Sequence, residues 1–330
     1  MGDHSEPAEH GIAARSPGAL YDPLWVGAVQ APVPERSTGD TAPERAVTSV
    51  LEGASSRVLF NTLVQTVGKL LGYGFALVTL ALTTRLLTTA EYGDFTIATV
   101  FISFFVLVAD SGITTAGVRE ASKYPALLQR YVDTAFSLKL LLGGVTYGVA
   151  ALVVSLLPYA PEVKVATYGL AVSYFFLSLA VSWDVAFQSR LRMEITALAD
   201  LALKLVAIAG VGAVFWYNHR SPLGQQRLFY LVVGISAAGN VAAALVRYVG
   251  ATGLVRLRLR FDRAAGRTLL RIAVPLAIVS VLGQVHYKAD TILLSLLKPA
   301  DQVAIYGVAY RVIDIPVSYT HLRAHETGRN

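Results

Sequence analysis

The chain has 330 residues, of which 54% are hydrophobic and only 15% are charged. Soluble proteins carry about a quarter charged residues, so this composition excludes an ordinary soluble domain and indicates a membrane protein. Cysteine is absent, which excludes disulfides, thiolate nucleophiles and Cys-ligated metals. The six histidines are scattered along the chain, so we expect neither a metal site nor a cofactor.

The formal net charge of +6 is spread unevenly. Residues 1–55 hold eight acids and three bases, a net of −5, so the remainder carries +11. The bases of the remainder lie between long apolar runs. This pattern favours contact with membrane lipids that have anionic heads and argues against nucleic acid as a partner.

Residues 1–57 are rich in Pro, Gly, Ala, Ser and Glu and show no apolar period. They lack both the positive start and the apolar stretch of a secretory signal peptide. We therefore expect a disordered cytoplasmic tail.

Long apolar stretches follow from Val58 onward. A bilayer core about 30 Å thick requires roughly 20 apolar residues in a helix. Seven candidate spans satisfy this: Val58–Leu87, Phe95–Gly117, Tyr131–Leu157, Val165–Phe187, Thr196–Tyr217, Leu228–Val249 and Leu269–Leu297. An eighth begins near Val303 and stops at Pro316. The predicted fold class is an all-α polytopic membrane protein.

The short loops between these spans differ in their content of Lys and Arg. If the N-terminus is cytoplasmic, the inner loops carry twelve of these bases and the outer loops five. Because cytoplasmic loops are enriched in Lys and Arg, this orientation is favoured.

The apolar pattern of the eighth span ends abruptly, and residues 317–330 are polar. They resemble translated adapter sequence at the broken end of a draft gene, so we expect a non-native tail on a truncated chain. The alternative is a genuine hydrophilic tail after a helix of about 13 residues, which is too short to cross the bilayer.

Three local patterns carry a family resemblance. The first is Thr84-Arg85-Leu86-Leu87 followed by Glu91-Tyr92-Gly93, and the second is Asp110-Ser111-Gly112 with Arg119. The third is Lys288-Ala289-Asp290-Thr291-Ile292-Leu293-Leu294-Ser295, then Tyr306-Gly307-Val308-Ala309-Tyr310-Arg311. In order and spacing they resemble the polysaccharide and O-antigen flippases of the multidrug/oligosaccharidyl-lipid/polysaccharide exporter superfamily.

The resemblance implies two six-helix lobes around a central cavity. Residues 58–250 would form the first lobe, 251–268 a basic interfacial linker and 269–316 the start of a second, truncated lobe. The implied function is translocation of a polyprenyl-diphosphate-linked oligosaccharide across the cytoplasmic membrane by alternating access, without enzymatic catalysis. The implied partners are that glycan and, through it, polysaccharide polymerase and export proteins.

An internal repeat agrees with this organisation. Leu86-Leu87 leads through a polar turn to Tyr92-Gly93, and Leu296-Leu297 leads in the same way to Tyr306-Gly307. Six spans separate the two copies, so both insert in the same orientation, as parallel repeats of transporters do.

Four lysines lie within the predicted spans, where a charge normally faces a cavity or a partner: Lys69, Lys139, Lys204 and Lys288. They are the candidates for a cationic substrate cavity. Lys139 and Lys204 could alternatively snorkel to the cytoplasmic face. Lys204 could also be neutralised by Asp200, one helical turn earlier.

The seventh span contains Pro275, which can kink the helix, and a polar outer half. Asp290 and His286 are candidates for ion coupling, because both can change protonation. The alternative is a polar end that reaches the outer interface.

Arg85, Asp110 and Arg119 lie at span ends and are interpreted as topology anchors or as an ion pair between helix ends. Two other functions remain open: a multidrug exporter of the same fold, or a membrane-bound polysaccharide polymerase or glycosyltransferase. The intramembrane lysines argue against cationic drugs. The sequence contains no Gly-rich nucleotide loop and no large loop with paired carboxylates, which argues against the enzymes.

Overall fold

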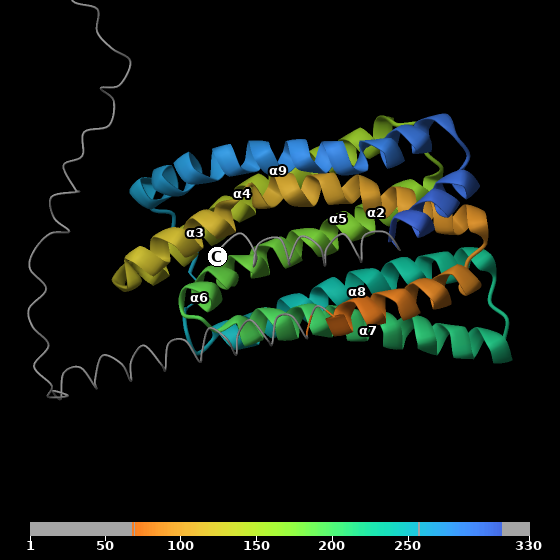
Figure 1. The fold of residues 1–330 in the computed structure, drawn as a ribbon, viewed down its shortest axis with the longest axis horizontal. Helices are drawn as coiled ribbons and strands as arrows, with labels where there is room; N and C mark the ends of the chain where they lie inside the picture. Colours follow the sequence, from red (N-terminus) through yellow and green to blue (C-terminus); the bar gives the residue numbers. More distant parts are fainter. Residues whose placement is uncertain (1–67, 69, 257, 312–330) are drawn as a thin grey trace, which may run out of the picture. The chain divides into compact units, whose positions relative to one another are not determined.

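The computed structural model describes residue 68, residues 70–256 and residues 258–311. Every described residue belongs to one compact unit, which begins at Gly53. The described residues form helices joined by short turns, with no strand among them (Figure 1). The expected tail over residues 1–57, Lys69 and the segment 317–330 lie outside the described residues.

The helices begin with Leu70–Leu86 and end with a helix over residues 300–311. Between them lie α2 (Thr89–Asp110), α3 (Ile113–Lys123), α4 (Leu128–Leu156), α5 (Pro161–Ala180), α6 (Asp184–Ser189), α7 (Met193–Arg220), α8 (Gln225–Ala251) and α9 (Arg263–Leu297). Six helical runs of the described residues are long and apolar enough to cross a membrane: Thr89–Lys123, Pro125–Leu156, Pro161–Ser189, Met193–Arg220, Gln225–Ala251 and Arg263–Leu297. The prediction of an all-α polytopic membrane protein is confirmed.

The expected span Phe95–Gly117 is two helices rather than one. Ser111 and Gly112 have φ values of 45° and 68°, which end α2 and start α3 at a break. A Cβ on Gly112 would lie 3.0 Å from the Cβ of Leu276, so glycine allows both the left-handed backbone and the close approach of α9. The Asp110-Ser111-Gly112 pattern is thus a helix break at a packing contact.

Two further elements differ from the expected boundaries. The fourth apolar stretch continues from α5 through a short 3₁₀ turn, Val181–Trp183, into α6. The non-helical linker after α8 ends at Asp262, and α9 then runs without interruption through Pro275. The side chain of Asp262 caps α9 by accepting hydrogen bonds from the amides of Ala264 and Ala265, both at 2.9 Å.

Neighbouring helices pack in pairs around two apolar clusters. α7 lies along α8, α5 contacts α2, α4 and α8, and α9 lies against α2, α3 and α4 (Figure 1). One cluster gathers residues near the α4–α5 and α7–α8 turns, including Tyr147, Val163 and Phe229. The other gathers residues of α3, α6, the N-terminal halves of α4 and α9 and the adjoining ends of α5, α7 and α8, and it includes Trp183 and Leu269.

The two copies of the Tyr-Gly repeat pack against each other. A Cβ on Gly93 would overlap the carbonyl oxygen of Ala300, and one on Gly307 would lie 2.6 Å from Cγ2 of Thr96. Gly93 therefore allows α2 to touch the backbone of the helix over 300–311, and Gly307 makes room for the side chain of Thr96. The guanidinium of Arg311 lies 5.7 Å from the ring centroid of Tyr92, which brings a third motif residue to the same contact.

Candidate functional site: charged groups within the helices

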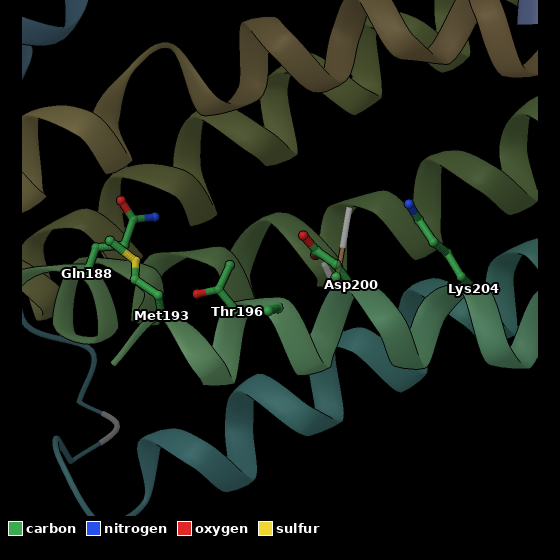
Figure 2. A pocket seen from close by; sticks show the side chains of 7 residues that line it. Gln188, Met193, Thr196, Asp200 and Lys204 are labelled. Atoms are coloured by element: carbon green, nitrogen blue, oxygen red, sulfur yellow. The ribbon is translucent and has the colours of Figure 1, made fainter. Parts of the chain in front are cut away.

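A polar pocket of about 170 Å³ lies beside α6 and α7. Its lining residues are Gly68, Gln188, Met193, Thr196, Ala197, Asp200 and Lys204. Thr196, Asp200 and Lys204 are each four residues apart, so their side chains project from one side of α7 (Figure 2). The pocket therefore places a carboxylate and an ammonium group on the wall of a membrane-spanning helix.

Lys204 extends from α7 across the first helix. Its Nζ lies 5.7 Å from the ring centroid of Tyr73, and a Cβ on Gly72 would approach its Cδ to 3.0 Å. Glycine at position 72 thus leaves room for the lysine stem. The half-buried ammonium group lies where the first helix and α7 meet, rather than at a helix end.

Arg247 forms a buried ionic cluster with two acids. Its Nε donates to Asp184 Oδ1 at 3.2 Å, and its Nη2 donates to Asp200 Oδ1 at 2.9 Å. The side chains of Arg247 and Asp184 are each only 6% exposed, whereas Asp200 is 61% exposed. The cluster ties α6, α7 and α8 together, and Asp200 joins it to the polar pocket.

This cluster concerns two expectations. Asp200 forms its ion pair with Arg247 on α8, so the neutralisation of Lys204 by Asp200 on the same helix stays a prediction. Arg247 is one of the twelve bases assigned to the inner loops from the sequence, but it is buried within α8. Leaving it out changes the count to eleven inner bases against five outer ones, which favours the same orientation.

Lys139 is fully enclosed by protein. Its Nζ lies 2.7 Å from Asp110 Oδ1 and donates to Thr114 Oγ1 at 2.7 Å, and Thr114 in turn donates to Asp110 Oδ1 at 2.7 Å. The triangle joins α4 to the break between α2 and α3. A buried lysine with a bonded counter-charge is the arrangement that a low-dielectric interior requires, and here it replaces snorkelling to a helix end.

The C-terminal half of α9 makes polar contacts with two other helices. Gln284 Nε2 donates to Ser103 Oγ on α2 at 3.1 Å, and the hydroxyl of Tyr306 donates to a carboxylate oxygen of Asp290. Nζ of Lys288 lies 4.7 Å from the ring centroid of Tyr310 and 4.8 Å from that of Tyr287. The side chains of Asp290 and Lys288 thus contact the helix over 300–311 from α9.

The start of α9 is fastened to α4 outside the membrane-spanning part. Arg130 Nη2 donates to Asp262 Oδ1 at 2.7 Å, in addition to the cap that Asp262 provides. The Arg130 hydrogen bond, followed by the bonds from the backbone amides, lowers the pKa of Asp262 to about 2. Asp262 is therefore ionised at every physiological pH, and this contact does not act as a pH switch.

The remaining predicted residues are either exposed or cap a helix. Arg85 and Arg119 are exposed near helix ends, and His286 is exposed on α9. Thr88 and Glu91 form a capping box at the start of α2, which explains the polar turn of the first motif. Among the described residues, no group of three or more His, Cys, Asp or Glu side chains could hold a metal ion.

Asp184 and Arg247 were not among the predicted site residues. Both positions fall within the apolar stretches Val165–Phe187 and Leu228–Val249, and a charge within an apolar span is itself a signal that a partner is required. Sixty-three residues separate them, so their pairing could not be inferred from helical periodicity.

These features define the class of the protein. It is a polytopic α-helical membrane protein with ion pairs between its apolar helices. The model of the polysaccharide biosynthesis protein family matches residues 58–322, and the chain belongs to this family. The match ends inside the segment 317–330, whose assignment as a non-native tail stays a prediction. Comparisons with curated proteins and with solved structures gave no match.

Proposed function

We propose that this membrane protein of polysaccharide biosynthesis is a flippase that translocates polyprenyl-diphosphate-linked oligosaccharide by alternating access between two lobes. The observation that carries the proposal is the polar pocket within the helices, whose wall presents Lys204. A diphosphate must cross an apolar barrier about 30 Å thick, and a cation along its path offsets the cost of leaving water.

Lysine suits such a path because its ammonium is a point charge with rotatable donors, without the fixed fork of arginine. A transporter must release its ligand, so a less rigid contact is an advantage. Lys204, Lys288 and Lys69 are the candidates for this role; Lys69 lies outside the described residues. Lys139, already bonded to Asp110 and Thr114, would act only if that pair opened during transport.

Ion coupling is assigned to Asp290, with His286 as the second candidate. The carboxylate of Asp290 accepts a hydrogen bond from Tyr306 on the next helix. Protonation would remove the charge that strengthens this bond, so the contact between α9 and the helix over 300–311 would loosen. This supports a role for Asp290 in coupling a proton or cation to helix movement.

The proposed location is the cytoplasmic membrane, with the N-terminus and the linker after α8 on the cytoplasmic side. Single cysteines at Ser55 and Thr252 should resist a membrane-impermeant thiol reagent in intact cells, whereas a cysteine at Pro299 should react. The natural chain has no cysteine, so each variant reports one position. Labelling at 55 and 252 in intact cells would reverse the topology; permeabilised cells provide the control.

The function is tested with the product of the complete gene. It is reconstituted in liposomes that contain a fluorescent polyprenyl-diphosphate oligosaccharide, and the share of glycan reached by an added membrane-impermeant glycosidase is followed over time. We expect this share to rise beyond that of protein-free liposomes. No difference from protein-free liposomes would contradict the proposal, and so would transport of cationic drugs without transport of the glycan.

A further inference from the structure

An apolar groove runs along the surface between α4 and α5. Its volume is about 520 Å³, within the range of roughly 300–1,000 Å³ that small-ligand sites occupy. The floor is made by small residues of α4, namely Gly144, Gly148 and Ala151. The other wall is aromatic and branched, with side chains from α5: Tyr168, Val172, Phe175 and Phe176.

The space above the glycines of the floor is not filled by other protein atoms. A Cβ added at Gly144 or at Gly148 would meet no atom within 4 Å. On the opposite wall, Val172 is 59% exposed and Phe176 is 52% exposed, so the groove faces outward along two spans. At membrane depth, an outward-facing groove is filled by hydrocarbon rather than by water.

The groove ends at a polar group beside the α4–α5 turn. The hydroxyls of Ser155 and Tyr168 are hydrogen-bonded at 2.9 Å, and Nζ of Lys164 donates to the carbonyl oxygen of Ser155 at 3.0 Å. Lys164 and Tyr168 are one helical turn apart on α5, on the face that continues into Val172 and Phe176. Glu162, two residues before Lys164, points to another side of the helix.

We propose that this groove binds one acyl chain of an anionic phospholipid, with the phosphate at Lys164 and the chain on the glycine floor. The charge lies where a headgroup would be, at the end of an apolar channel that lies within the bilayer. A second copy of the chain fits less well, because close helix packing needs small residues on an open face. Here the large side chains of Tyr168 and Phe176 line the groove next to the small residues and would hinder the close approach of a second helix. The site depends only on membrane embedding and is independent of the proposed transport.

The experiment is native mass spectrometry of the whole 330-residue chain in detergent, titrated with phosphatidylglycerol or with zwitterionic phosphatidylcholine. The unchanged chain should retain more phosphatidylglycerol than phosphatidylcholine. Gly148→Leu fills the floor and should lower its retention about tenfold, since several methylene contacts are lost. Lys164→Ala should lower retention about fivefold, the effect of one cation near an anionic headgroup, and should abolish the preference over phosphatidylcholine.

Gly234→Leu on α8 is the matched control. Gly234 is also exposed and free of neighbours within 4 Å, but it does not line the groove, so retention should not change. Size-exclusion profiles identify any misfolded variant, and Gly144→Leu then replaces Gly148→Leu. Equal retention in the Gly148→Leu and Gly234→Leu variants would overturn the proposal. So would preferential retention of polyprenyl phosphate, or a lipid-free dimer that Gly148→Leu abolishes.

Discussion

Arg247→Met should lower the free energy of unfolding by about 3–5 kcal/mol, the usual cost of removing one partner of a buried ion pair. The variant leaves the Asp184 carboxylate 6% exposed and without its counter-charge. Methionine fills a similar volume, so the loss reports the charge rather than a cavity. The measurement is the unfolding midpoint of the purified chain in mild detergent, titrated with a denaturing detergent.

A second substitution separates charge from packing. Adding Asp184→Asn to Arg247→Met removes the uncompensated carboxylate and should restore most of the stability. Arg192→Met is the matched control, because the pair of Arg192 with Glu194 is 49% and 44% exposed and should contribute at most about 1 kcal/mol. A loss in Arg247→Met no larger than in Arg192→Met would show that the cluster does not hold α6, α7 and α8 together.

Lys204→Ala should reduce glycan export by roughly 10- to 100-fold, which corresponds to losing a charge-assisted contact of about 1.5–3 kcal/mol. Lys288→Ala and Lys69→Ala should act in the same direction if these side chains line the same path. The measurement is polysaccharide export in a strain that depends on the complete gene, with the amount of protein in the membrane determined in parallel.

Conservative and surface variants complete this test. Lys204→Arg should retain part of the export, because the charge survives with a different geometry. Lys123→Ala is the control: Lys123 is 49% exposed and pairs with Glu120 at a helix end, so export should be normal. Normal export by the Lys204→Ala, Lys288→Ala and Lys69→Ala variants would remove these lysines from the mechanism.

The helices could be predicted from hydropathy for a physical reason. A bilayer offers no water to backbone amides and carbonyls, so each apolar stretch of sufficient length must form a helix. The expected stretches Tyr131–Leu157 and Leu228–Val249 correspond closely to α4 and α8. The break after Asp110 was missed because two left-handed residues interrupt an otherwise continuous apolar pattern.

The candidate site was predicted only in part. Sequence identified Lys139 and Lys204 as charges that required an explanation, and the structure gives them different surroundings. Lys139 is enclosed and bonded to Asp110, whereas Lys204 lines a pocket. Both lie about the same distance into their spans, so depth along the helix could not distinguish them. The difference depends on which neighbouring helix faces each lysine.

The sequence by itself determined the membrane environment, the approximate bounds of most long helices, and the presence of charges inside them. These features follow from residue-by-residue transfer between water and hydrocarbon. The tertiary structure decided which charges meet. Asp184 joins Arg247 across 63 residues, and Gly93 of one repeat meets Ala300 beside the other. Such contacts depend on helix rotation and on close packing between distant segments, and a one-dimensional pattern carries neither.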